Sequence, residues 1–219
     1  MVTALGGDLW LNRKSIYTEG TTAAFFHGAP NGSVVPYWDY RLLPDLERGE
    51  YTKKRDDVLL FTATEAYEIT YKGKVALPKE QQEDIMRRRK HSVESVVDVW
   101  LKAPGVMVVS EGTSVVERRL ADKVSILSAD NDSVTLELDQ DTHLPLRRTF
   151  RYRNDQFKDW DEDAEEYEDY HTIQGLPTAF SISRYHNGDM QNERFIKKVE
   201  YNTDMAPAIF DVNKPLLKK

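Results

Sequence analysis

Apolar and polar residues alternate with a period of two along most of this chain, and turn signals separate the alternating segments. Tyr37 and Asp39, for example, alternate with Trp38 and Tyr40, and Gly188 marks a turn between two later segments. Segments of this kind predict strands at residues 14–26, 34–43, 50–54, 58–71 (one long strand or a bent pair), 75–77, 106–109, 114–120, 123–129, 134–139, 146–153, 170–174, 178–186 and 193–201. Strands this short and closely spaced indicate an antiparallel sheet, barrel or sandwich.

Residues 79–103 form the one strongly helical stretch. Pro78 precedes it, and its first half places acidic residues early and the basic residues 87–90 late, which matches the helix dipole. Ser92 predicts a restart as the N-cap of a second helix. The apolar positions that would face the sheet are Ile85, Val93, Val96, Val97, Trp100 and Leu101. With neither a repeat nor a long linker, we expect a single domain over residues 1–219, in which one curved sheet embraces one helical segment.

The first seven residues resemble the last turn of a helix that Gly6 and Gly7 terminate. A helix needs more residues than this before its cap. We therefore expect the natural chain to begin further upstream, with a first helix and an export signal that this sequence lacks.

Composition narrows the function. The chain has 219 residues, 30 Lys and Arg against 37 Asp and Glu, a net charge of −7 and no cysteine. The acidic balance argues against binding to a nucleic-acid backbone, and the missing cysteines exclude thiolate catalysis and cysteine-ligated metals. The sequence has no run of 18 apolar residues that could span a bilayer.

The sequence contains no specific motif for catalysis or for binding a cofactor. The five histidines are not at helical metal-ligand spacing, and the glycines form neither a phosphate loop nor a dinucleotide fingerprint. We therefore predict no enzyme activity, no catalytic residue, no bound metal and no cofactor. The acidic run 159–169 could bind calcium, but a solvated face or loop is the favoured interpretation. Likewise residues 87–90 could contact anionic headgroups or an acidic partner, but a solvated helix end is favoured.

Aromatic residues recur on the predicted strands and on the helix. They can form an ordinary core, or a strongly curved sheet can leave a cavity that a lipid occupies. The sequence alone leaves both interpretations open.

The second half of the chain resembles a known family in three stretches. Residues 134–139 followed by Thr142, Leu144 and Pro145 resemble a strand–turn–strand unit of the outer-membrane lipoprotein-sorting proteins. Residues 167–177 resemble that group's stretch of tyrosines, aspartate, glycine and proline. The family's closing hairpin and tail are similar to residues 187–189 and 199–202, with Phe210 and Pro215. The end of its first helix is similar to residues 4–7.

This resemblance to the LolA/LolB-like superfamily implies a mainly β (α+β) fold: a strongly curved antiparallel sheet, or half-open β-barrel, with helices covering its concave face. It also implies a periplasmic or outer-membrane-associated protein, since members carry lipoprotein acyl chains through the periplasm. The expected partner is then a lipid or an acylated protein. Inward apolar positions that would contact it are Tyr67, Ile69, Tyr71, Val97, Trp100, Leu136 and Ile182.

Two other functions remain open from the sequence. The domain could be a protein-interaction or envelope-sensor module with a solid core and no lipid cargo. An enzyme would need histidines and carboxylates clustered in one cleft.

Overall fold

The computed structural model describes residues 1–154 and 156–213, and Pro215 lies outside these ranges. Its strands form one 14-stranded antiparallel sheet. The first half of the chain contributes β1 (Ser15–Phe26), β2 (Ala29–Pro30), β3 (Val35–Leu42), β4 (Leu46–Tyr51), β5 (Asp57–Phe61), β6 (Ala66–Thr70) and β7 (Gly73–Ala76). The second half contributes β8 (Met107–Val116), β9 (Arg119–Leu127), β10 (Ser133–Asp139), β11 (Pro145–Asn154), β12 (Asp159–Ile173), β13 (Leu176–His186) and β14 (Asp189–Tyr201).

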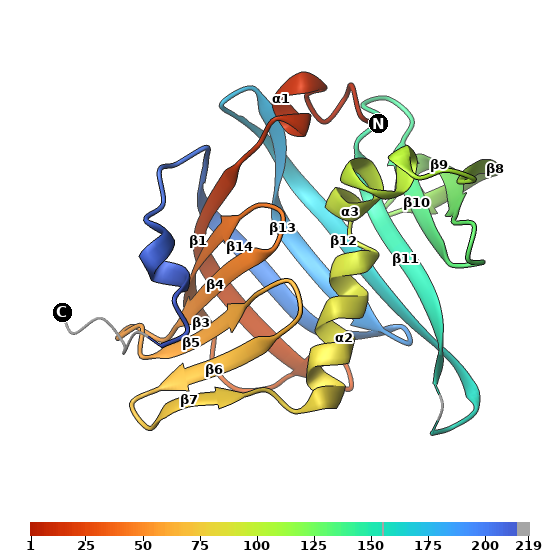
Figure 1. Cartoon of the computed structure of the whole chain (residues 1–219). Coiled ribbons are helices and arrows are strands. Elements are labelled where there is room, and N and C mark those ends of the chain that lie inside the picture. The colour runs from red at the N-terminus through yellow and green to blue at the C-terminus, as the bar shows by residue number, and fades with distance from the viewer. Residues whose placement is uncertain (155, 214–219) are drawn as a thin grey trace.

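The sheet consists of two meanders joined along one seam. Its strand order is β7-β6-β5-β4-β3-β1-β14-β13-β12-β11-β10-β9-β8, with β2 paired to β1. The seam pairs β1 with β14, and the two free edges are β7 and β8. The sheet curves into a half-barrel, and α2 (Lys79–Lys90) and α3 (Val93–Asp98) run from one edge to the other across its concave side (Figure 1). The predicted curved sheet with one helical segment is therefore confirmed.

The helical segment breaks where the sequence predicts. The Ser92 hydroxyl accepts a hydrogen bond from the Ser95 amide at 3.1 Å and caps α3. His91 joins the two helices to the sheet: its ring stacks on Phe150 with centroids 4.2 Å apart, and its Nε2 lies 2.8 Å from Asp132. After α3, a short 3-10 helix, η1 (Trp100–Lys102), leads to β8, and a second, η2 (Pro207–Phe210), follows β14.

Two predicted turns lie elsewhere. The turn expected between the predicted strands 34–43 and 50–54, at residues 45–49, is displaced: residues 46–49 belong to β4, and the chain reverses at residues 43–45. The predicted strands 114–120 and 123–129 are displaced because the β8–β9 hairpin turns at Glu117 and Arg118, with φ of 45° and 65°. Two-residue hairpins with positive φ usually carry Asn or Gly, so Glu-Arg gives no turn signal.

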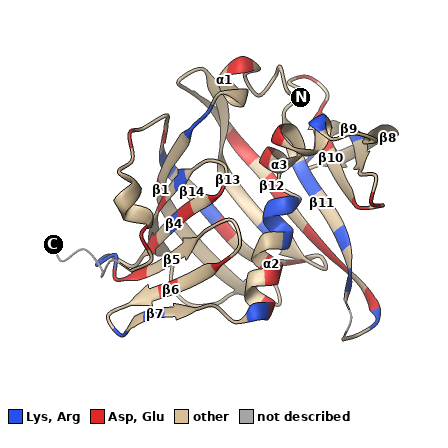
Figure 2. Ribbon diagram, viewed as in Figure 1, with Lys and Arg blue, Asp and Glu red and all other residues tan. Residues whose placement is uncertain are grey.

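The acidic run 159–169 is not a loop: it lies in a strand whose residues Asp163 and Glu166 are buried, while Asp159, Glu162, Glu168 and Asp169 are exposed, so the predicted solvated face holds for part of the run. It begins β12, which pairs with β11 so that Glu166 faces Arg147 and Glu165 faces Arg148. Arg148 is fully buried, and its Nη2 lies 2.9 Å from the Glu165 carboxylate. Figure 2 shows the basic bands of β11 beside the acidic bands of β12. Opposite charges on neighbouring strands stabilise the pairing.

The basic residues at the end of α2 are also not merely solvated. Arg89 forms an ion pair with Glu47 on β4 at 2.6 Å, and the Arg87 guanidinium lies 3.9 Å from the ring centroid of Tyr152 on β11. α2 contains no fully buried residue. Side chains from both halves of the sheet therefore hold this helix across the opening.

The amino-terminal residues form a terminated helical turn, as predicted. The Gly7 amide donates to the Val2 carbonyl at 3.0 Å and the Gly6 amide donates to the Thr3 carbonyl at 3.1 Å. Gly6 has φ of 120°, which favours glycine. The turn places Leu5 in the core, and the short α1 (Asp8–Leu11) follows.

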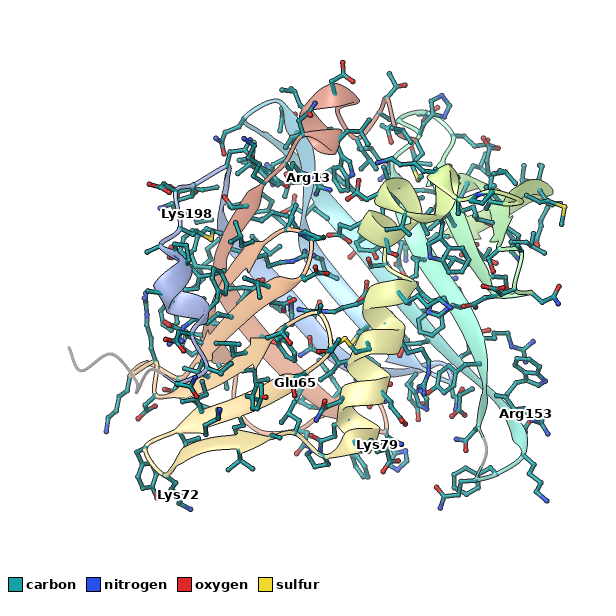
Figure 3. All side chains as sticks on the ribbon, viewed as in Figure 1. Arg13, Glu65, Lys72, Lys79, Arg153 and Lys198 are labelled. Carbon is teal, nitrogen blue, oxygen red and sulfur yellow. The ribbon has the colours of Figure 1, made fainter. Side chains whose placement is uncertain are left out.

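The main core lies between this amino-terminal turn, α3, η1 and the concave side of the sheet. Its buried residues include Leu5, Val96, Val97, Trp100, Val134, Leu136 and Phe150. A smaller cluster of Val58, Leu60 and Ile69 lies on β5 and β6. In Figure 3 Arg13 lies below α1, toward the main core, whereas Lys72 projects from the β6–β7 turn at the edge.

Candidate functional site

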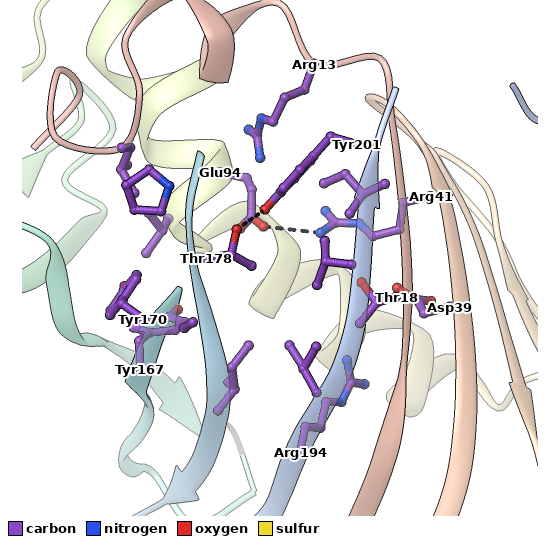
Figure 4. A pocket seen from close by; sticks show the side chains of 18 of the residues that line it. Arg13, Thr18, Asp39, Arg41, Glu94, Tyr167, Tyr170, Thr178, Arg194 and Tyr201 are labelled. Atoms are coloured by element: carbon purple, nitrogen blue, oxygen red, sulfur yellow. Dashed lines mark hydrogen bonds and ion pairs between the residues drawn. The ribbon is translucent and has the colours of Figure 1, made fainter. Parts of the chain in front are cut away.

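A cavity of about 160 Å³ lies on the concave side of the sheet, beneath α1 and α3. It is bordered by the amino-terminal segment, by α3 and by strands from both sides of the β1–β14 seam (Figure 4). Its lining residues are Leu5, Trp10, Arg13, Ile16, Thr18, Tyr37, Asp39, Arg41, Val93, Glu94, Pro145, Tyr167, Tyr170, Pro177, Thr178, Ala179, Ile182, Arg194, Ile196, Val199 and Tyr201. The site therefore combines apolar, aromatic and charged side chains.

A β-bulge at the seam shapes this lining. Glu19 pairs with Lys198, but the next residue, Gly20, pairs with Ile196, so Lys197 is an extra residue on β14. The extra residue changes which side chains face inward, and Arg194, Ile196, Val199 and Tyr201 all reach the cavity. A Cβ on Gly20 would lie 2.2 Å from the Phe195 carbonyl oxygen, so the close strand approach requires glycine there.

Strands β1, β13 and β14 supply one apolar wall of the cavity. Ile16, Ile182, Ile196 and Val199 supply branched aliphatic side chains, and Ala179 leaves space between them. Such a surface favours methylene groups of a ligand over water.

One end of the cavity is closed by paired polar groups. Arg41 on β3 donates to the Glu94 carboxylate on α3 at 3.2 Å, and the Tyr201 and Thr178 hydroxyls lie 2.8 Å apart. Burial raises the pKa of Glu94, but the charges of Arg41 and Arg13 outweigh this and hold the pKa below its usual value. Glu94 is therefore a carboxylate at neutral pH and ties the helical segment to the sheet.

The other end carries polar groups without such partners. Within the described residues, Asp39 and Arg194 form neither a side-chain hydrogen bond nor an ion pair within 4.0 Å, and the buried Tyr37 hydroxyl is unpaired. Burial, together with the nearby Glu47 charge, raises the pKa of Asp39 to about 7. In Figure 4 Arg194 extends toward Asp39 and Thr18 with no dashed line to either.

The predicted binding residues are not brought together at this cavity. Of the seven, only Ile182 lines it. Val97, Trp100 and Leu136 are buried in the main core, where the Trp100 indole donates to the Lys90 carbonyl at 2.9 Å. Tyr67 and Ile69 belong to the cluster on β5 and β6, and Tyr71, expected to point inward, is 83 % exposed.

The charged cavity residues are those that the sequence interpretation missed. These residues are polar, so they fall outside the apolar pattern that predicted the binding residues: they are Arg13, Asp39, Arg41, Glu94 and Arg194. Gly20 was a usable signal, because an isolated glycine within a strand often marks a bulge or a close backbone approach.

The histidines do not contribute to this site: none of them is among the residues that line it. Within residues 1–154 and 156–213, no three His, Cys, Asp or Glu side chains are grouped so that they could hold a metal ion. Across the same residues, no helix has the length and apolar character needed to cross a bilayer.

Comparison with known proteins identifies the fold. No protein-family model matches the chain, and no curated protein matches it in sequence. Among solved structures, a LolA superfamily protein from Nitrosomonas europaea superposes with a TM-score of 0.61 at 12% identity, covering 95% of this chain and 96% of that one. This chain has the LolA-like fold.

Two further structures agree with the LolA-like assignment. A domain named for outer membrane lipoprotein sorting, from Vibrio parahaemolyticus, gives a TM-score of 0.58 at 10% identity and covers 93% of this chain and 91% of its own. A DUF1329 family protein from Desulfovibrio piger gives 0.57 at 12% identity, with 95% and 94% covered. The predicted resemblance is thus confirmed for the fold, which by itself does not determine a ligand.

Proposed function

We propose that this protein is a cell-envelope binding protein that takes up an apolar ligand, the acyl chain of a lipid or lipoprotein, in its half-barrel without catalysis. The observation that carries the proposal is the cavity between α3 and the β1–β14 seam, with its wall of Ile16, Ile182, Ile196 and Val199. Each methylene buried there contributes about 0.8 kcal/mol to binding. The LolA-like fold and the relative named for lipoprotein sorting support a periplasmic or outer-membrane-associated location.

The size of the cavity limits what enters the closed form. A volume of about 160 Å³ is below the roughly 300–1,000 Å³ of typical ligand pockets. It is close to the volume of about 150 Å³ that accepts benzene in an apolar cavity. A short acyl chain therefore fits as the structure stands, and a longer one requires α3 and the amino-terminal segment to shift outward.

The test is native mass spectrometry of the protein purified from an envelope extract, followed by solvent extraction and lipid analysis. We expect a co-purifying lipid near one-to-one stoichiometry. Ile182→Trp, which fills the cavity, should lose it, whereas Val115→Trp, which adds the same indole at a site 63 % exposed, should keep it. A bare mass that stays bare after incubation with fatty acids, phospholipids and an acylated peptide would contradict the proposal.

One observation favours a second candidate, an interaction module. β8 is an open edge of the sheet, and Met107, Val108 and Val109 on it are 58 %, 59 % and 45 % exposed. Apolar edges without charges pair readily with other strands. The other edge is different, since Lys72 and Lys74 flank or occupy β7.

The partner best matched to this edge is a second copy of the chain. The acidic residue of β8, Glu111, is already paired with Lys123, so two β8 edges do not repel each other. Light scattering coupled to gel filtration should then show a dimer that Val108→Lys converts to a monomer. A monomer at all concentrations rejects this second function.

A further inference from the structure

The unpaired end of the cavity has the chemistry of a headgroup site. Three arginines and two carboxylates line the cavity. Arg41 and Glu94 neutralise each other, and Arg13 lies 3.5 Å from Asp98. Arg194 and Asp39 are left, and within the described residues neither has a charged side-chain atom of opposite sign within 4.0 Å.

Arg194 is positioned to bind rather than to support the sheet. It pairs in register with Ile182 on β13, so both face the cavity and its guanidinium stands next to the aliphatic wall. The guanidinium lies 5.5 Å from the ring centroid of Tyr37, and among residues 1–154 and 156–213 no side-chain hydrogen bond occupies its N–H groups. A guanidinium fork binds a carboxylate through two parallel hydrogen bonds.

Tyr37 provides a second donor at the same end. Its side chain is 3 % exposed, and its hydroxyl has no hydrogen-bond partner among the described residues. Burial raises the pKa of Tyr37 to about 12, so the hydroxyl keeps its proton at neutral pH. A buried hydroxyl without a partner costs free energy, and a ligand oxygen would remove that cost.

Asp39 sets the charge of the ligand. Because its pKa is near 7, Asp39 is largely protonated in mildly acidic solution, and Arg194 is then the one unbalanced charge at this end. A single negative charge matches a single cation. A doubly charged phosphate ester would be repelled by the fraction of Asp39 that is ionised.

We propose that the cavity recognises a monocarboxylate with a short apolar chain, whose carboxylate is bound by Arg194 and the Tyr37 hydroxyl while its chain lies against Ile182, Ile196 and Val199. This inference rests on the proposed function and names its ligand class. The volume of about 160 Å³ suits a chain of roughly six carbons. Longer fatty acids would bind through the same headgroup if the helical segment moves.

The experiment is calorimetric titration of the full chain with hexanoate, hexan-1-ol and hexyl phosphate at pH 6.5. We expect hexanoate to bind more tightly than hexyl phosphate. Arg194→Gln should weaken hexanoate about 10- to 100-fold, the effect of losing a charged hydrogen-bonding group. Tyr37→Phe should weaken it several-fold, and Arg194→Lys should fall between wild type and Arg194→Gln because it keeps the charge without the fork. Hexan-1-ol, which carries no charge, should be weakened much less than hexanoate by each of the three substitutions.

Arg151→Gln is the matched control, since Arg151 is exposed and outside the cavity. Equal hexanoate affinity in the wild type and Arg194→Gln would overturn the inference, and so would tighter binding of hexyl phosphate. If hexanol still binds in those cases, the proposed apolar site survives. If neither hexanol nor hexanoate binds the wild type, both the inference and the proposed function fail. If Arg194→Gln does not fold, the test is a pH titration of carboxyl-labelled hexanoate bound to the wild type, followed by its carbon-13 chemical shift. Binding by Arg194 lowers the pKa of the bound carboxyl group. An unchanged or raised pKa would contradict the inference.

Discussion

The Arg41 guanidinium on β3 lies 3.2 Å from the Glu94 carboxylate on α3, and the pair joins the sheet to the helical segment at the rim of the cavity. We expect Glu94→Gln to lower the free energy of unfolding by roughly 1–2 kcal/mol at pH 7, because a half-buried charge-assisted hydrogen bond is lost. Urea denaturation measures this change. Arg41→Gln and the double variant complete a cycle, and a coupling energy of zero would show that the pair does not stabilise the fold.

Because Asp39 is buried, we expect the free energy of unfolding to fall as the pH rises. Burial raises its pKa in the folded protein to about 7, whereas the unfolded chain releases the proton near pH 4. The folded state therefore binds more protons between these values, and its stability is lost as the pH rises from about 4 through 7. The charges facing Asp39 are Glu47, Arg194, Arg41 and Arg89. Asp39→Asn should remove this dependence and be more stable than the wild type at pH 8, and parallel pH profiles would contradict the assignment.

Glu165 predicts the opposite trend in acid. Burial raises its pKa, but the adjacent Arg148 charge dominates and lowers it to about 2. The contribution of the pair is present above about pH 4.5 and lost as the pH falls toward 2. Glu165→Gln should cost roughly 3 kcal/mol at pH 7, because it leaves the buried Arg148 undercompensated. Thermal unfolding from pH 2 to 7 checks this, and a cost that persists at pH 2 would be inconsistent with it.

Gly20 predicts a steric cost at the seam. Its substitution by Ala places a Cβ 2.2 Å from the Phe195 carbonyl oxygen, a backbone atom that cannot move without shifting β14. We expect Gly20→Ala to lower stability by roughly 2–3 kcal/mol. Gly49→Ala is the comparison, since its Cβ meets the movable Tyr51 ring at 3.1 Å and should cost less. Equal costs would mean that the bulge tolerates a side chain.

Local chemistry explains what the sequence could predict. The restart of the helix at Ser92 can be predicted from the sequence, because the capping hydroxyl and the amide from which it accepts a hydrogen bond are only three residues apart. The alternating pattern predicts most strands for the same reason, since successive residues of a strand point to opposite faces and their alternation is visible within a few positions.

Pairing between distant residues explains what it could not predict. The acidic run forms a partly buried strand because Arg148 lies opposite Glu165 across the sheet, and that register is absent from either segment alone. The cavity lining depends on one extra residue, Lys197, which brings Arg194 and Val199 to the same face. The apolar strand pattern therefore indicates Ile182 but not the charged residues around it.

The proposed binding of an acyl chain is tested most directly by NMR of isoleucine-methyl-labelled protein with a short-chain fatty acid whose methylene groups carry ordinary hydrogen rather than deuterium. Ile16, Ile182 and Ile196 line the cavity, whereas Ile69 is buried in the separate cluster on β5 and β6 and serves as the internal control. We predict nuclear Overhauser effects from the ligand's methylene protons to the three cavity methyl groups and none to Ile69. Effects confined to other methyl groups, or none at saturating ligand, would contradict binding in this cavity.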